Sequence, residues 1–128
     1  MLDRLFGGDT FVATTRALDA AALRHQVIAN NLANVNTPGY KRQEVQFEAQ
    51  LARALAQRDN PCVRACTPIS AIKPQVVTIN TTSMRNDGNN VDMETEMVQL
   101  AANTLTFEAL SDRIAGYFSG LKAVINGR

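Results

Sequence analysis

The residues of this chain best suited to chemistry are one histidine and two cysteines. Cys62 and Cys66 are separated by three residues, and His25 lies far earlier in the sequence. Two cysteines cannot complete a structural zinc site, which takes four Cys or His ligands. A local disulfide in an oxidising compartment and free thiols are both compatible with their spacing. The sequence places no nucleophile or acidic partner beside His25, so we interpret it as a hydrogen-bonded helix histidine.

A second candidate site is the segment 86–90, which reads Asn-Asp-Gly-Asn-Asn. It invites comparison with a calcium-binding EF-hand loop, which needs a bidentate Glu at its twelfth position. Counted from Asp87, that position is Val98. The sequence also shows no nucleotide-binding loop, no metal-ligand cluster and no nucleophile–base pair. We therefore expect no catalytic residue, no metal, no cofactor and no small-molecule substrate, and predict that the protein is not an enzyme.

Composition limits what the rest of the chain can be. Its 128 residues suit one domain with arms. Apolar residues make up 45%, but aromatics only 5%, and much of the remainder is alanine, which buries little area. The net charge of +1 gives no reason to expect nucleic acid. The sequence has no apolar run long enough to span a membrane and no apolar signal-peptide region after residues 1–8, so it predicts a cytosolic chain unless an uncleaved segment directs export.

Heptad spacing predicts a long helix after a flexible arm at residues 1–9. Asp9 or Thr10 can cap it. The spacing of apolar and small residues over more than three heptads favours a helix with a narrow seam. One row of the seam is Phe11, Leu18, His25 and Leu32, and the other is Thr14, Ala21, Ile28 and Val35.

The end of this helix is unusually rich in asparagine. Asn30, Asn31 and Asn34 fall within the helical pattern, although the Asn amide competes for backbone groups. Pro38 then forces the preceding residue out of the α region, and Gly39 permits a turn. We predict a chain reversal here.

The middle of the chain differs from both ends in its amino-acid composition. Apolar spacing predicts a second, shorter helix that starts near Gln43 or Glu44 and stops before Pro61. Three prolines and many Thr and Asn residues then indicate an irregular loop, with one short β segment at 76–79. Between positions 41 and 73 there are six basic and three acidic residues.

The last third of the chain predicts the clearest helix. Asp92 can cap it, and Glu94 and Glu96 place negative charge against its N-terminus. Five acids and two basic residues lie between positions 92 and 125, which is compatible with contacts to the basic middle or with a solvated face. The first row of the predicted seam is Met93, Leu100, Phe107, Ile114 and Leu121. The second row is Met97, Thr104, Ser111, Phe118 and Ile125.

These patterns predict an all-α fold in which two long terminal helices pair as a coiled coil. A shorter middle helix and an irregular loop with one short β segment complete it. We divide the chain into an arm at 1–9, a helix–turn–helix unit at 10–58, a loop at 59–90 and a long helix at 91–128. Because the seam rows contain Thr and Ser, we expect neighbouring chains to complete the burial.

Two strings resemble motifs of a known family. Residues 29–41, Ala-Asn-Asn-Leu-Ala-Asn-Val-Asn-Thr-Pro-Gly-Tyr-Lys, resemble the N-terminal motif of bacterial flagellar rod, hook and hook-associated proteins. Residues 87–97, Asp-Gly-Asn-Asn-Val-Asp-Met-Glu-Thr-Glu-Met, resemble a segment of the small rod proteins. With its short length and its ending near 123–127, the chain is most similar to the FlgB family of rod proteins. The resemblance covers about residues 10–58 and 85–127.

The resemblance implies a structural subunit of the proximal rod of the flagellar basal body, in the periplasm. It implies export by the flagellar type III apparatus without a cleaved signal peptide. The implied partners are other rod proteins, copies of the chain itself, FliE, and components of the export gate and membrane ring. The alternatives are another rod paralogue of the FlgC type and a cytosolic, chaperone-like helical adaptor. The latter gives no reason for the two motifs.

Residues of both motifs and of the C-terminal seam are the predicted assembly residues. We expect the Asn side chains to bridge helix ends or subunits, the turn to direct the next segment to an adjacent subunit, and the seam to hold the helices together. The predicted residues are Asn30, Asn31, Leu32, Asn34, Thr37, Pro38, Gly39, Tyr40, Asp87, Gly88, Asn89, Val91, Met93, Met97, Leu100, Phe107, Ile114 and Leu121.

Overall fold

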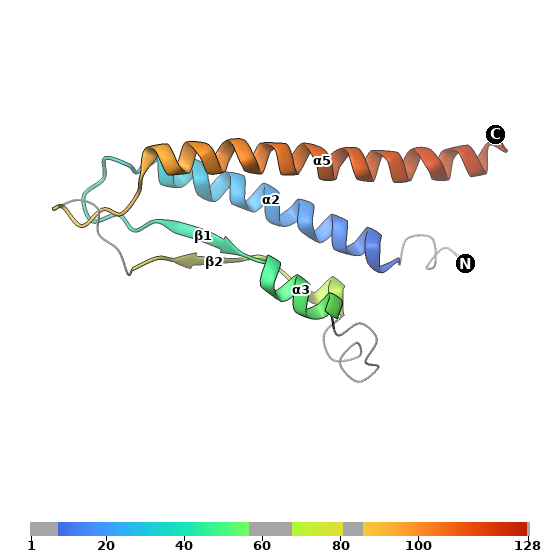
Figure 1. Ribbon diagram of the computed structural model, residues 1–128, viewed down its shortest axis with the longest axis horizontal. Coiled ribbons are helices and arrows are strands. Elements are labelled where there is room, and N and C mark those ends of the chain that lie inside the picture. The colour runs from blue at the N-terminus through green and yellow to red at the C-terminus, as the bar shows by residue number, and fades with distance from the viewer. Residues whose placement is uncertain (1–7, 57–67, 81–85, 128) are drawn as a thin grey trace.

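A computed structural model of the chain describes residues 8–56, 68–80 and 86–127. Most of the expected arm, both cysteines and the predicted helix stop at Pro61 lie outside the described residues. The protein is mainly α-helical, as predicted from the sequence. Two long helices, α2 (Asp9–Ala33) and α5 (Met93–Ile125), run antiparallel along each other (Figure 1). No described helix is long and apolar enough to cross a membrane.

The start of α2 differs from the prediction. Gly8 is the N-cap and no side chain caps the helix, whereas Asp9 lies in the first turn. There its carboxylate lies near the positive end of the helix dipole. The helix ends at Ala33, so Asn34 is its C-cap rather than a helical residue, with its backbone N–H donating to the carbonyls of Asn30 and Asn31.

A strand replaces the first part of the predicted second helix. β1 (Gln43–Gln46) is extended, and α3 (Glu48–Ala56) begins only after Phe47. Gln and Glu favour helices locally, but Val45 is buried in a strand that pairs with residues 75–78. Tertiary pairing has therefore overridden the local preference. The prediction was right that a short middle helix exists and wrong about where it starts.

The predicted β segment is the partner of β1. After the 3-10 turn η1 (Ile69–Ala71), β2 (Gln75–Thr78) pairs antiparallel with β1, with Val45 opposite Val76 and Gln43 opposite Thr78. The backbone N–H of Ile79 donates to the Arg42 carbonyl at 2.8 Å, which extends the ladder by one rung. The molecule thus has a two-stranded sheet where one β segment was expected.

A small core lies on the side of α2 that faces α3. Ala20, Phe47 and Ile72 are buried together, and Ala17, Leu51 and Ala54 pack around them. Alanines let α2 approach closely but bury little area, so each apolar contact contributes modestly to stability. Figure 1 shows the sheet and α3 on one side of α2 and α5 on the other, so α2 is covered on two sides.

The buried face of α5 does not coincide with the predicted second row of the seam. The side chains buried in α5 are Glu96 and Asn103, at 1% and 4% exposure, whereas Met93 and Met97 are 56% and 50% exposed. The predicted first row is partly right, because Leu100, Ile114 and Leu121 are half-buried, but Phe107 is 39% exposed. On α2, Ala21 and Ile28 are buried as predicted, whereas His25 is exposed and does not lie on the seam. Apolar periodicity cannot identify a seam whose most buried members are polar.

Candidate functional site

The side chain of Asn31 is the centre of a buried polar cluster. It is fully buried in the last turns of α2. Its Nδ2 donates to the Gln43 carbonyl at 2.8 Å and to Glu96 Oε2 at 3.1 Å. Its Oδ1 accepts from the Gln43 backbone N–H at 3.0 Å and from the Tyr40 hydroxyl at 3.3 Å. All four hydrogen-bonding positions of the amide are filled. Toward Gln43 it acts as a neighbouring strand would, because it satisfies both backbone groups at one position of β1.

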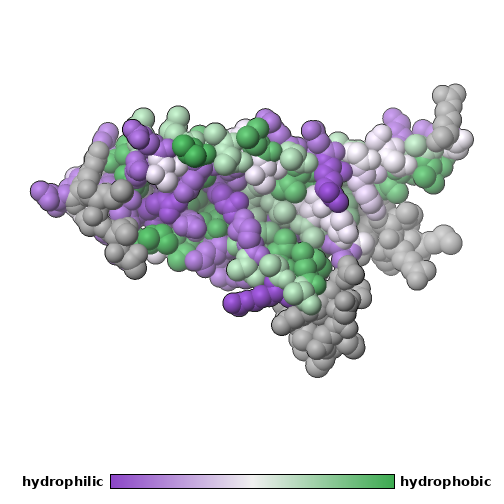
Figure 2. All heavy atoms as spheres, viewed as in Figure 1, coloured by the Kyte–Doolittle hydropathy of each residue, from purple (hydrophilic) through white to green (hydrophobic). Residues whose placement is uncertain are grey.

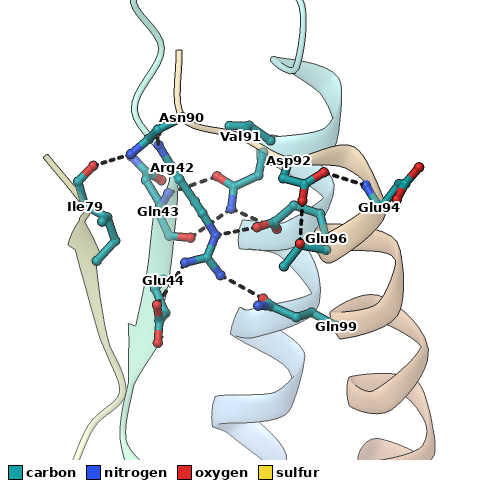
Figure 3. Close-up of polar contacts among 12 residues, drawn as sticks. Arg42, Gln43, Glu44, Ile79, Asn90, Val91, Asp92, Glu94, Glu96 and Gln99 are labelled. Atoms are coloured by element: carbon teal, nitrogen blue, oxygen red, sulfur yellow. Dashed lines mark hydrogen bonds and ion pairs between the residues drawn. The ribbon is translucent and has the colours of Figure 1, made fainter. Parts of the chain in front are cut away.

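Arg42 joins this cluster to α5 (Figure 3). Its Nε forms an ion pair with Glu96, Nη2 donates to Gln99 Oε1 at 2.8 Å, and Nη1 contacts Glu44 Oε2 at 3.0 Å. Burial lowers the pKa of Arg42, but the hydrogen bonds and charges of Glu96 and, to a smaller extent, Glu44 outweigh it and raise that pKa overall. The guanidinium is therefore held charged against a carboxylate that is 1% exposed. This pair is one contact of the kind with which the basic middle and the acidic helix were compatible.

Asn90 completes the open end of the two-stranded ladder. Its Oδ1 accepts from the Arg42 backbone N–H at 2.6 Å, and its Nδ2 donates to the Ile79 carbonyl at 2.7 Å. The amide is thus inserted between two backbone groups that would otherwise face each other directly in the ladder. Figure 3 shows it beside the ends of both strands. The second motif therefore fixes the register of the sheet.

Asn89 closes the C-terminal end of α2. Its Nδ2 lies 3.1 Å from the carbonyls of Asn34 and Val35 and 2.9 Å from that of Thr37. Its Oδ1 accepts from the Val91 backbone N–H at 2.7 Å. The last carbonyls of a helix lack helical partners and need other donors. Asn89, which is fully buried, supplies such a donor to the C-cap residue Asn34 and to the turn that follows it, from 52–55 positions further along the chain.

Two glycine turns bring the motifs into contact. Gly39 and Gly88 have φ values of +73° and +81°, which favour glycine. The Gly39 backbone N–H donates to the Asp87 carbonyl at 3.0 Å, and Lys41 Nζ donates to the Gly88 carbonyl at 2.7 Å. We call the joined segments, residues 31–43 and 87–96, the motif clasp.

The remaining residues of the first motif are at the rim of the clasp. Asn30, Thr37 and Pro38 are exposed, and Leu32 is half-buried. Asn34 Nδ2 donates to the Asn30 carbonyl at 2.9 Å, and Thr37 Oγ1 donates to Asn34 Oδ1 at 3.2 Å. The chain reversal was predicted to direct the next segment to an adjacent subunit. In the structure this segment returns along its own α2, and its contact with an adjacent subunit stays a prediction.

Tyr40 shows how closed the clasp is. Burial, together with the nearby charge of Glu96, raises the pKa of its hydroxyl above the usual value of 10.0. The hydroxyl remains protonated and can donate to Asn31. The side chains of the motif clasp make hydrogen bonds and ion pairs. In the described parts of the chain, no group of three His, Cys, Asp or Glu side chains lies close enough together to hold a metal ion.

Several residues of the clasp were not singled out as site residues. Arg42, Gln43 and Asn90 were not among the predicted assembly residues, and Glu96 was assigned only to the helix N-terminus. Asn103, which donates to the Ala21 carbonyl at 2.9 Å, was also missed. The sequence did contain a signal for this buried face of α5, a further row with seven-residue spacing. Its members are Glu96, Asn103, Leu110 and Tyr117. Tyr117 lies 4.8 Å, centroid to centroid, from Phe11 at the other end of the helix pair.

One side of α5 remains uncovered and apolar. Thr104 and Phe107 of α5 line a groove of about 310 Å³ with Ala22, His25 and Gln26 of α2. Figure 2 shows apolar patches between polar ones along the upper margin, where α5 lies in Figure 1. We define the α5 stripe as the exposed apolar residues of the predicted seam. They are Met93, Met97, Phe107, Phe118 and Ile125.

Comparison with known proteins gives the class to which this arrangement belongs. A family model described as flagella basal body rod protein matches residues 13–41, which include most of α2 and the first motif. The chain is 33% identical over 137 residues to flagellar basal body rod protein FlgB of Bacillus subtilis (strain 168), covering 96% of this chain and 97% of that protein. It is 32% identical to FlgB of Escherichia coli (strain K12), with 98% and 97% covered.

A third relative, FlgB of Borrelia hermsii, is 34% identical over 86% of this chain and 90% of its own length. These likenesses extend through both motifs and the segment between them. The chain belongs to the FlgB family of flagellar basal body rod proteins.

Proposed function

We propose that this protein is a structural subunit of the proximal rod of the flagellar basal body, located in the periplasm. The observation that supports the proposal most is the α5 stripe. Its members are 39–82% exposed along the flank of the α5 face that packs against α2. Exposed apolar side chains that gather along one side of a helix are typical of protein–protein interfaces. Neighbouring subunits in a packed tube would cover it.

The motif clasp has a different role in this proposal. Asn31 and Asn89 have their hydrogen-bonding capacity used within the chain, so they shape the subunit and are not free to contact a neighbour. Exposed residues at the rim, such as Asn30 and Pro38, are the members of the first motif that can contact another chain. In this proposal, assembly uses two exposed surfaces, the rim of the motif clasp and the α5 stripe. The buried polar cluster around Asn31 holds both surfaces in position.

The finer partners follow from the family and are part of the proposal. They are other rod proteins, further copies of this chain, FliE, and components of the export gate and membrane ring. Export by the flagellar type III apparatus, without a cleaved signal peptide, would bring the chain to the periplasm. The small alanine-rich core supports this route, because a weakly stabilised subunit can be kept unfolded until it docks.

Mass spectrometry of detergent-washed hook–basal bodies tests the assignment. We expect this chain in a few copies per particle. Its absence from particles that contain the other rod proteins would overturn the rod assignment and favour the cytosolic adaptor.

Met97→Asp tests the stripe, because Met97 is half-exposed and the change need not bury a charge in the isolated subunit. We expect a folded chain, checked by circular dichroism, that is lost from basal bodies and abolishes motility. Val98→Asp is the matched control, since Val98 is 69% exposed but points about 100° away around the helix. Normal incorporation of Met97→Asp, or equal loss with Val98→Asp, would remove the stripe from the proposal.

A further inference from the structure

Among the residues that the structure describes, the sheet leaves one strand edge open. The Ile79–Arg42 hydrogen bond fixes the alternation of the ladder, so that Gln75, Val77 and Ile79 turn their backbone groups toward β1. The backbone groups of Val76 and Thr78 therefore point away from β1. In Figure 1, β2 is the outermost strand, and Val76 is 45% exposed. An edge of this kind is a template for another strand.

The opposite edge of the sheet is closed. Gln43 turns its N–H and C=O away from β2, and both are taken by the Asn31 amide. The next outward residue, Val45, is 3% exposed. Within the described parts of the chain, β2 is therefore the edge at which the sheet can grow. Identical copies that each offer a single edge can pair only about a two-fold axis, with β2 against β2.

The sequence of the edge suits pairing with itself. Residues 74–80 contain no charged side chain, so two copies can approach without like-charge repulsion. Charged or proline residues within an edge strand usually prevent such pairing, and β2 has neither. An antiparallel register centred on Val77 opposes Val76 to Thr78 of the second copy and makes four backbone hydrogen bonds. It also places Val77 opposite itself in a close, non-hydrogen-bonded pair.

We infer that free subunits pair through β2, as a two-fold antiparallel dimer centred on Val77 that converts two two-stranded sheets into one four-stranded sheet. The contact is closed and short, so it is weak and does not propagate along a rod. It keeps an otherwise exposed edge covered in subunits outside the rod.

Site-specific disulfide formation tests the register. In a chain with Cys62→Ser and Cys66→Ser, we expect Val77→Cys to give a covalent dimer when diamide takes up the two electrons and two protons released by the two thiols. The Cα atoms of such a pair lie ~4.5 Å apart, within disulfide range. Gln75→Cys lies on the same face of the strand, but its two copies would be about 14 Å apart. We expect it to stay monomeric under the same conditions.

Proline substitution provides the second test, by sedimentation of the native chain at high concentration. Val76→Pro removes an outward N–H and leaves the inner ladder intact, so we expect a folded chain with dimerisation weakened by at least about tenfold. Equal cross-linking at positions 75 and 77, or unchanged association of Val76→Pro, would overturn the inference. So would a native chain that stays monomeric at every concentration, which would leave the edge to a strand of a different protein. None of these results bears on whether the chain is present in basal bodies.

Discussion

Replacing Asn31 by alanine removes the amide at the centre of the motif clasp. The Gln43 N–H and C=O, which Asn31 covers with a fully buried side chain, then lose their partner, and Glu96 and Tyr40 each lose one hydrogen bond. A buried polar group left without a partner costs about 1–3 kcal/mol. Counting the two backbone groups, and allowing Glu96 to keep Arg42, we expect Asn31→Ala to lower the free energy of unfolding by about 3–5 kcal/mol.

Asn30→Ala is the matched control for this prediction. It changes the same residue type one position earlier in the same helix, but at an exposed site. Alanine is the better helix former, so we expect a change within about 0.7 kcal/mol, in the stabilising direction. The assay is urea unfolding followed by circular dichroism. With a slope near 1.5 kcal/mol per molar, the loss for Asn31→Ala moves the midpoint down by roughly 2–3 M. Midpoints that agree for the two variants would refute the view that the Asn31 amide holds the clasp together.

Two further outcomes can be checked in the same urea assay. Gly88→Ala should cost about 1–2 kcal/mol, because a Cβ strains a residue held at positive φ, whereas Gly116→Ala within α5 should stabilise by about 0.5–1 kcal/mol; equal effects would argue against the turn geometry. The main cause that lowers the pKa of Asp92 is the hydrogen bond from the Thr95 hydroxyl. The folded state therefore releases the carboxyl proton of Asp92 more readily than the unfolded state does. The stability that the ionised Asp92 contributes to the folded state is present above about pH 4. It is lost as the pH falls through the lowered pKa of the folded state. Asp92→Asn keeps a cap and should unfold with a weaker dependence on pH between about 2 and 5, and an unchanged pH profile would show that Asp92 is not part of this dependence.

The long elements could be predicted from the sequence because their signals are local. Heptad spacing located α2 and α5, Asp92 was correctly identified as a cap, and the β-branched run at 76–79 indicated β2. The start of α3 could not be predicted in this way. Whether residues 43–46 form a helix or a strand is decided by a partner strand some 30 residues away, and no local preference records that pairing.

The two motifs were identified as functional strings, but the sequence did not predict that they touch. Asn31 and Glu96 are both polar residues on helices that were expected to bury apolar seams. A polar residue at a core position is indistinguishable from a surface residue until its partner is known, and here the partner lies 65 positions away. The burial of Asn103 was missed for the same reason, as its acceptor, the Ala21 carbonyl, is 82 positions distant.

The long sequence separation within the motif clasp has a consequence for how the chain folds. Local contacts in α2 and α3 can form early, but Gln43, Arg42 and the end of α2 are satisfied only by residues 89–96. High contact order of this kind slows folding, because loop closure costs entropy before the contacts that stabilise it can form. In a chain delivered N-terminus first, Gln43, Arg42 and the end of α2 would lack these partners until residues 89–96 arrive. The clasp can therefore form only after most of the chain has been delivered.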